Sequence, residues 1–199
     1  MDCNTITEQV MRRIFVELEA SGRHVHVTKD QAMALFGHPL TPKRELSQPG
    51  QYLANERVSV IGPKGEFRNV AVLGPERSAG QVELSMTDTR VLGIDAPVRL
   101  SGQTQNSPGI TLQNGAASVE LPEGVIVARR HIHITPEDAR LMGVKDKQVV
   151  QLQTFTDRPL IFKDVVVRVN PQFQTRAHLD YDEANACGFQ NGDLGRILP

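Results

Sequence analysis

The stretch Arg-His-Val-His-Val-Thr at residues 23–28 returns, nearly unchanged, as Arg-His-Ile-His-Ile-Thr at residues 130–135. In an extended strand, residues i and i+2 point to the same face. Each pair of histidines therefore projects from one face, while the Val or Ile residues point the opposite way into a core. Two imidazoles on one face of a strand can bind a divalent transition metal. A single His-x-His is often only a polar solvent face, but the repeat holds four of the six histidines, which favours metal binding.

Length and composition point to two small domains rich in β-structure. A chain of 199 residues can form one large domain or two small ones, and the duplicated stretch favours two similar halves. Val and Ile are frequent, Trp is absent, and 16 Gly and 12 Pro supply many turns. This mixture is typical of short strands rather than long helices.

Charge and hydropathy argue against several classes of partner. The net charge of −1 provides no basic field for nucleic acid and no polybasic patch for a membrane surface. No apolar run approaches the length of a membrane span, and residues 1–13 are polar and mixed, unlike a signal peptide. Cys3 and Cys187 are the only cysteines, so no disulfide framework is indicated. A reducing, cytoplasmic compartment is the expectation.

Turn signals separate many short predicted elements. After a polar tail over residues 1–13, we predict strands over 14–21, 57–61, 67–73, 81–85, 98–100, 110–112, 118–121, 124–128, 148–155, 160–162 and 165–169. Met86 is placed on the apolar face of strand 81–85, and residues 38–50 are predicted to be a loop. Short helices are predicted to run from Thr28 to Gly37, over 87–93, from Thr135 to Gly143 and over 182–186. The pattern predicts a mainly β fold of two small β-barrels, each with a short helix after its His-x-His strand.

Each histidine pair needs a third donor to form a catalytic-type metal centre. Glu83 lies on a predicted strand face beside a Gly-rich loop, and His178 lies near a strand start. They are the candidates for the two centres, although Glu83 can equally be a solvent-facing carboxylate and His178 a surface histidine. His38, before Pro39, is interpreted as structural.

Arg77 is a further candidate, because it lies in a loop just before the strand that carries Glu83. A guanidinium near a metal is suited to binding an oxyanion or phosphate. A lone loop arginine is more often a solvated charge, so the interpretation depends on its spacing from Glu83.

These motifs together resemble the PduL-type phosphate acyltransferases, also called phosphate propanoyltransferases or phosphotransacylases. The resemblance rests on both hexapeptides, on Gly-Pro-x-Arg at 74–77 with Gln-Val-Glu-x-Ser at 81–85, and on His178 ahead of Asp-Glu-Ala-Asn-Ala at 182–186. It covers about residues 14–198. The motifs are long and ordered, so chance is a poor explanation.

The resemblance implies a metal-dependent exchange of acyl-CoA plus phosphate with acyl phosphate plus CoA, with acetyl or propanoyl as the acyl group. It implies two β-barrel domains, one formed by residues 14–22 plus 129–199 and the other by the inserted residues 23–128, with a di-metal site at their interface. Zinc would be bound by one set of His24, His26 and Glu83 and by a second set of His131, His133 and His178. Arg77 would bind phosphate, and Ser21, Arg44, Leu73 and Asn185 would contact coenzyme A.

The resemblance also bears on location and partners. Members from bacterial microcompartments carry a longer N-terminal helix and linker, whereas about thirteen residues precede the first predicted strand here. We therefore expect a cytoplasmic enzyme, with the microcompartment lumen, and contacts with its shell as cargo in propanediol degradation, as the alternative. A homo-oligomer is compatible with the pattern.

Three other classes share part of the pattern. A cupin-like metal oxygenase would place a Glu a few residues after the His pair, but Lys-Asp-Gln follows at 29–31. A metallo-hydrolase of the H-x-H-x-D-H type would need Asp-His after the pair, which neither copy has. A zinc-binding module without acyltransferase activity would need no arginine beside the metal.

Overall fold

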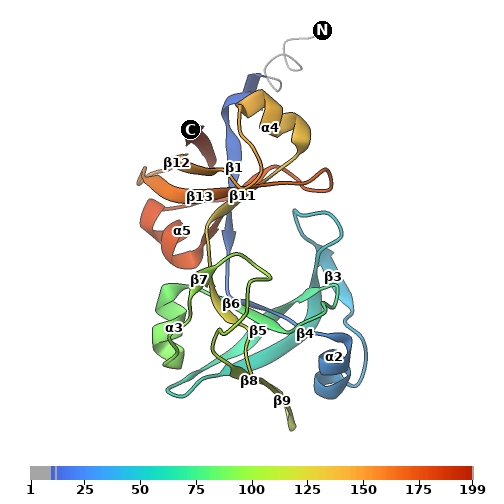
Figure 1. Cartoon of the computed structure of the whole chain (residues 1–199). Coiled ribbons are helices and arrows are strands. Elements are labelled where there is room, and N and C mark those ends of the chain that lie inside the picture. Colours follow the sequence, from blue (N-terminus) through green and yellow to red (C-terminus); the bar gives the residue numbers. More distant parts are fainter. Residues whose placement is uncertain (1–9, 12, 199) are drawn as a thin grey trace. The chain divides into compact units, whose positions relative to one another are not determined.

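A computed structural model describes residues 10–11 and 13–198, so the predicted tail over residues 1–13 lies largely outside the described residues. The chain divides into two compact units. We call Met1–Ser21 with Arg129–Pro199 the barrel unit, and Gly22–Ala128 the sheet unit (Figure 1). Short strands predominate in both units, which confirms the mainly β prediction.

The barrel unit closes its strands in the order β1-β14-β11-β13-β12-β15. Closure removes the free sheet edges. Alternating side chains fill the interior, and Val16, Ile132, Ile134 and Leu152 are at most 1% exposed. The strands are β1 (Val16–Ser21), β11 (His131–Ile134), β12 (Val149–Phe155), β13 (Ile161–Val169), β14 (Arg176–Asp180) and β15 (Leu194–Leu198), and the helices are α4 (Pro136–Met142) and α5 (Tyr181–Cys187).

Two predictions for the barrel unit were wrong in detail. The strands expected over 160–162 and 165–169 are one strand, β13, in which Asp164 has a φ of 56°. Asp tolerates this left-handed conformation, so the strand continues through a local distortion that looked like a break in the pattern. Strand β15 was missed, because Leu194–Leu198 contains Gly195 and is only partly buried.

The sheet unit contains a nine-stranded sheet that curls into a half-barrel, with the order β7-β10-β6-β2-β5-β4-β8-β9 and with β3 paired to β4 (Figure 1). Val25, Val27, Val72 and Val82 are fully buried in its core. Its strands are β2 (His24–His26), β3 (Pro42–Glu45), β4 (Tyr52–Ile61), β5 (Glu66–Gly74), β6 (Gln81–Leu84), β7 (Val98–Arg99), β8 (Ile110–Asn114), β9 (Ala117–Leu121) and β10 (Val125–Ala128), and its helices are α2 (Lys29–Phe36) and α3 (Met86–Leu92).

Three boundaries in the sheet unit differ from the predictions. Residues 38–50 are not all loop, because they contain β3, whose side chains are all exposed and show no apolar alternation. Strand β4 begins at Tyr52 instead of residue 57. Met86 does not face the core with Val82 and Leu84: β6 ends at Leu84, Ser85 caps α3, and Met86 is 43% exposed.

The helix-start signals in both hexapeptides work as predicted. Thr28 caps α2 in a capping box with Gln31, and Thr135 caps α4 with Pro136 in the first turn. Gly37 and Gly143 end these helices in the left-handed conformation that favours glycine. Each histidine strand therefore leaves the sheet at a defined residue, which fixes the orientation of the strand end.

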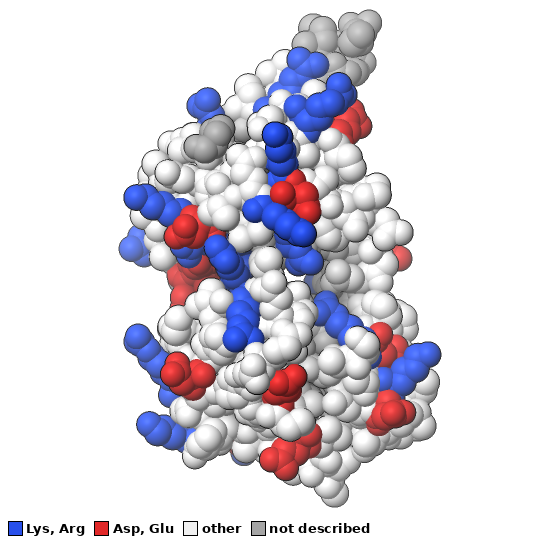
Figure 2. Space-filling model, in the orientation of Figure 1, with Lys and Arg blue, Asp and Glu red and all other residues white. Residues whose placement is uncertain are grey.

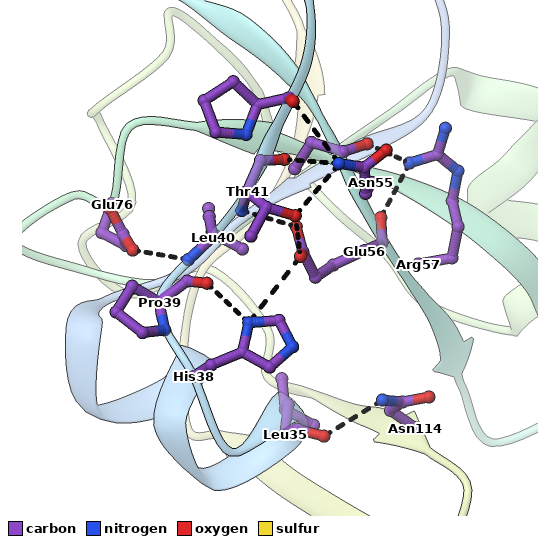
Figure 3. Close-up of polar contacts among 12 residues, drawn as sticks. Leu35, His38, Pro39, Leu40, Thr41, Asn55, Glu56, Arg57, Glu76 and Asn114 are labelled. Atoms are coloured by element: carbon purple, nitrogen blue, oxygen red, sulfur yellow. Dashed lines mark hydrogen bonds and ion pairs between the residues drawn. The ribbon is translucent and has the colours of Figure 1, made fainter.

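A polar cluster joins the segment after α2 to strand β4 (Figure 3). The Thr41 hydroxyl donates to Glu56 Oε1 at 2.5 Å and the Thr41 backbone N–H to Oε2 at 3.0 Å, while His38 Nδ1 lies 3.9 Å from Oε1. Burial raises the pKa of Glu56, but the hydrogen bonds from Thr41 outweigh it, so the net shift is downward. Glu56 is therefore ionised at neutral pH, and the position of His38 fits a structural role.

The described surface carries both signs of charge. Figure 2 shows Lys and Arg side chains interspersed with Asp and Glu on the face drawn, in line with the net charge of −1. Among the described residues, no helix has both the length and the apolar character needed to cross a membrane.

Candidate metal centres

The first candidate centre lies in the sheet unit, where β2 pairs parallel with β5 and antiparallel with β6. In this register His24 lies opposite Glu83, and His26 is on the same face of β2 as His24. One ligand atom from each of the three residues lies within 4.8 Å of the others. All three side chains are buried, with residue exposures of 7%, 2% and 6% for His24, His26 and Glu83.

The second candidate centre lies in the barrel unit and repeats this construction. Strand β11 pairs parallel with β13 and antiparallel with β14, and His131 lies opposite His178. Potential ligand atoms of His131, His133 and His178 again lie within 4.8 Å of one another. The three imidazole centroids are 4.6–4.9 Å apart. The structure thus brings all six predicted ligands into two groups of three.

The geometry of the first centre fits a tetrahedral metal ion. Glu83 Oε1 is 3.5 Å from His24 Nε2 and 3.7 Å from His26 Nε2. Metal–ligand bonds of about 2.0–2.1 Å place neighbouring tetrahedral ligand atoms about 3.4 Å apart. The two distances from Glu83 are therefore close to those around one ion, the two histidine ligand atoms lie within 4.8 Å of each other, and a three-residue set leaves a fourth position open.

Backbone carbonyls orient the first histidine of each pair in the same way. His24 Nδ1 donates to the carbonyl of Gly22 at 2.8 Å, and His131 Nδ1 donates to the carbonyl of Arg129 at 2.9 Å. With the proton on Nδ1, the Nε2 lone pair is available to a metal. Such hydrogen bonds to metal-binding histidines set the tautomer and the ring orientation. The Nδ1 hydrogen bonds of His24 and His131 therefore also fit metal binding.

The protonation states of the first centre favour a cation. Burial lowers the pKa of His26 to about 4, so its imidazole is neutral at pH 7. Burial raises the pKa of Glu83, but attraction to His24 and His26 outweighs it and holds the pKa well below the usual range. For His24, burial lowers the pKa, but Glu83 outweighs it, so the net pKa is raised. A metal ion here would replace a proton shared between His24 and Glu83.

A hydrogen-bonded chain connects Arg77 with Glu83. Arg77 Nη1 donates to Ser101 Oγ at 2.9 Å, Gln81 Nε2 donates to the same Oγ at 2.9 Å, and Gln81 Nε2 also donates to Glu83 Oε1 at 2.6 Å. The positive charge of Arg77 lowers the pKa of His24 and of His26, which places it near the centre. Arg77 is therefore not an isolated loop charge.

Two residues of this hydrogen-bonded chain, Gln81 and Ser101, were not predicted to be functional. Gln81 lies two residues before Glu83 in the predicted strand 81–85, and this spacing, which puts both side chains on one face of the strand, is the signal available in the sequence. Ser101 carries no comparable signal in the sequence, because it lies in a turn twenty residues after Gln81 that only folding brings close.

The arginine of each hexapeptide forms an ion pair with the helix that follows the strand of the third candidate ligand. Arg23 Nη2 lies 2.7 Å from Asp88 Oδ1 in the first turn of α3, and Arg130 Nη1 lies 2.5 Å from Glu183 Oε1 in the first turn of α5. Both helices directly follow the strand that carries the third ligand. These ion pairs tie the two ligand strands of each unit together.

The four residues expected to contact coenzyme A are divided between the units. Arg44 pairs with Leu53, which pairs with Leu73, so Arg44 and Leu73 lie in one row across β3, β4 and β5. The Leu73 carbonyl is 3.2 Å from His26 Nδ1. In the barrel unit, Ser21 ends β1, and Asn185 is exposed on α5. Their joint role in binding stays a prediction.

Comparison with known proteins identifies the class. A family model described as phosphate propanoyltransferase matches residues 17–190. Phosphate propanoyltransferase of Enterococcus faecalis is 57% identical, covering 98% of this chain and 96% of the relative. The protein of the same name from Listeria monocytogenes is 53% identical with 98% and 94% coverage, and that of Salmonella typhimurium is 48% identical with 91% and 87%.

The fold, the two centres and these relatives define a phosphate acyltransferase, a transferase that exchanges an acyl group with phosphate. The chain belongs to the phosphate propanoyltransferase family.

Proposed function

We propose that the chain is a metal-dependent phosphotransacylase that interconverts acetyl- or propanoyl-CoA plus phosphate with the acyl phosphate plus CoA. The observation that carries the metal dependence is the pair of three-residue groups, each with its ligand atoms within 4.8 Å of one another. In the first group, the distances from Glu83 to the two histidines are also close to those between neighbouring ligand atoms around a tetrahedral ion. That both centres serve one reaction is part of the proposal.

Zinc is the metal that we propose for both centres, because two or three imidazoles with at most one carboxylate form a typical catalytic zinc set. His24, His26 and Glu83 would bind one ion, and His131, His133 and His178 the other. Bound there, zinc would act as a Lewis acid that offsets negative charge on oxygen and on the coenzyme A thiolate.

Arg77 is proposed to bind and orient the phosphate. Its guanidinium can present two parallel N–H groups to two phosphate oxygens. Its hydrogen bond to Ser101, 2.9 Å long, limits its rotation. Fixing phosphate against the bound thioester converts an encounter of two substrates into a reaction within one complex, which supplies much of the rate enhancement.

The transfer is proposed to be direct. A phosphate oxygen attacks the thioester carbonyl carbon, the new C–O bond forms, the C–S bond breaks, and coenzyme A leaves as the thiolate. Cys187 is a poor candidate for a covalent intermediate, because it is fully buried and burial raises the pKa of its thiol. Cys3 lies outside the described residues.

Ser21, Arg44, Leu73 and Asn185 are proposed to contact coenzyme A. The exposed Arg44 offers a cation for its phosphates, and the half-buried Leu73 an apolar contact. A cytoplasmic or microcompartment location, contacts with a shell and a homo-oligomeric state stay predictions.

An assay of thiol release tests the proposal. Purified, zinc-loaded protein is mixed with propanoyl- or acetyl-CoA, with and without phosphate and with and without a chelator. We expect release that requires phosphate and is abolished by the chelator. Release without phosphate would indicate a thioesterase instead, and release unaffected by complete metal removal would refute the metal dependence.

The role of Arg77 is tested separately with Arg77→Ala. Loss of a charge-assisted hydrogen-bonding group should raise the KM for phosphate about 10- to 100-fold, while the zinc content stays unchanged. Arg68→Ala is the matched control, because Arg68 is an exposed arginine of the same unit paired with Glu66 at 2.5 Å. Loss of zinc in the Arg77 variant would contradict the assigned role.

A further inference from the structure

Gln81 is held in one orientation by three hydrogen bonds. Its Nε2 group donates to Glu83 Oε1 at 2.6 Å and to Ser101 Oγ at 2.9 Å, and its Oε1 accepts from the backbone N–H of Gly102 at 2.8 Å. Both amide hydrogens are used, and a flipped amide would face the Glu83 carboxylate with its oxygen. The side chain is buried, with a residue exposure of 3%. Gln81 therefore fixes the position of one Glu83 oxygen.

Ser101 has a defined hydroxyl direction because of the same contacts. Its Oγ accepts from Gln81 Nε2 at 2.9 Å and from Arg77 Nη1 at 2.9 Å. A serine oxygen has two lone pairs and one proton, so both lone pairs are occupied. The hydroxyl proton then points away from both donors and is left to donate to an acceptor next to the Arg77 guanidinium.

The described part of the barrel unit shows no such arrangement, although it shares the strand register. Gln81 pairs with His26 on β2, and the residue paired with His133 on β11 is Arg176. Arg176 Nη1 lies 2.5 Å from Glu17 Oε2, so this side chain forms an ion pair between neighbouring barrel strands, β14 and β1. Among the described residues, the Gln81–Ser101 chain is therefore specific to the sheet unit, where it links Arg77 to Glu83.

We propose that Ser101 is an additional anion-binding residue, whose hydroxyl donates to a phosphate oxygen beside Arg77, and that Gln81 is the positioning residue that links it to the metal ligand Glu83. This inference rests on the proposed function, since phosphate is the anion that function supplies. Ser101 thus adds a neutral donor to the positive charge of Arg77, and Gln81 keeps the anion site and the metal ligand in a constant relation.

Phosphate binding without acyl-CoA tests Ser101. The thermal unfolding midpoint of the zinc-loaded protein is measured against phosphate concentration, because a ligand of the folded state raises it in a saturable way. Ser101→Ala should need about tenfold more phosphate for half of the effect, and Ser101→Thr, which keeps the hydroxyl, should behave as wild type. Ser107→Ala is the control, since it removes another buried serine hydroxyl of this unit, one that accepts from Gly124 N–H at 3.0 Å.

Gln81→Met tests the positioning role by a readout other than activity. It keeps the side-chain volume but removes the hydrogen bond to Glu83, and such a loss typically weakens metal binding 10- to 100-fold. Competition with a chromogenic chelator measures this in a variant lacking His131, in which only the sheet-unit centre remains.

The outcomes are distinct. The inference is overturned if Ser101→Ala needs the same phosphate concentration as wild type, if Ser107→Ala changes it equally, or if phosphate does not shift the wild-type midpoint. Unchanged metal affinity in Gln81→Met overturns the positioning role. Failure of the proposed function is recognised separately, by wild-type protein that binds phosphate yet releases no thiol from acyl-CoA.

Discussion

The sheet unit and the barrel unit build their centres with the same parts and differ in what lies beside them. In both, an arginine precedes the first histidine and stacks over a phenylalanine ring: Arg23 is 4.1 Å from the centroid of Phe67, and Arg130 is 5.8 Å from that of Phe162. In both, a residue with φ of 56° lies two residues before the strand residue paired with that histidine: Asn69 before Ala71 in one, and Asp164 before Val166 in the other. These features, which both units share, position the pair of histidines in each unit.

The differences begin at the third ligand. The sheet unit supplies Glu83 and the barrel unit His178 at the same register position. With a divalent ion, a set with one carboxylate carries one positive charge less than a set of three neutral imidazoles. The loop before that strand also differs between the units. In the sheet unit it brings Arg77 near the first centre, whereas in the barrel unit it packs Phe173 against His133 at a centroid distance of 4.0 Å. Two units with the same strand register at the histidine pair thus hold two candidate centres that differ in charge and polarity.

Removing a ligand from either unit should have the largest effect. His24→Ala and His131→Ala should each lower the metal content by one ion per chain, because each leaves two ligands. The rate of phosphate-dependent thiol release should fall about 1,000-fold in both, since a metal supplies several kcal/mol of charge stabilisation. Metal analysis of the purified variants and steady-state assays check this. Full activity in one of the two would show that the units are not equal partners in the reaction.

Exchanging the third ligands tests the difference directly. Glu83→His and His178→Glu should retain metal, because each still offers three donors, but activity should fall about 10- to 100-fold. In Glu83→His, Gln81 also loses the acceptor of its 2.6 Å hydrogen bond. Metal content and turnover are measured in parallel. Wild-type activity in both exchanged variants would mean that the charge difference between the units has no role.

Acid should weaken the sheet-unit centre in a predictable direction. Metal must displace the proton that Glu83 stabilises on His24, whose pKa is raised although burial alone lowers it. Affinity should therefore fall about tenfold for each pH unit below that pKa, while His26, with a pKa of about 4, adds no competing proton near neutrality. Chelator competition at pH 8, 7 and 6 in His131→Ala measures this; a constant affinity over this range contradicts it.

Breaking the arginine ion pairs should have the smallest effects, and the loss of stability should be larger in the sheet unit than in the barrel unit. Asp88 has a side-chain exposure of 4% and Glu183 one of 15%, so loss of the partner leaves a more deeply buried charge in the sheet unit. Arg23→Gln should lower the free energy of unfolding by about 2 kcal/mol and Arg130→Gln by about 1 kcal/mol. Chemical denaturation of each variant gives the values, and the reverse order would refute the reason given.

What could be predicted from sequence was largely local. The alternation in the hexapeptides predicted that Val25 and Ile132 are buried, and both are fully so. Thr28 and Thr135 marked helix starts, since caps depend on neighbours within three residues. The exposed strand β3 was missed because burial patterns cannot reveal a strand with no buried face.

Pairings between distant segments were beyond local patterns. From sequence alone Glu83 could be a ligand or a solvent-facing carboxylate, and its burial opposite His24 depends on strand pairing between distant segments. The contact of Gln81 with Ser101 depends on a turn elsewhere in the chain, which periodicity does not predict. The linear order of the elements also did not indicate that β1 pairs with β14; only the family resemblance suggested such an exchange.

The pairing of β1 with β14 and β15 has a consequence for synthesis. Strand β1 precedes the sheet unit in the chain, whereas the other strands of its barrel follow that unit. As the chain leaves the ribosome, Gly22–Ala128 can collapse as soon as it has emerged, whereas Val16 and Leu18 have no barrel to enter until β14 exists. We therefore expect nascent chains truncated after residue 128 to contain a folded sheet unit and an unprotected apolar N-terminal strand, the segment on which a chaperone would act.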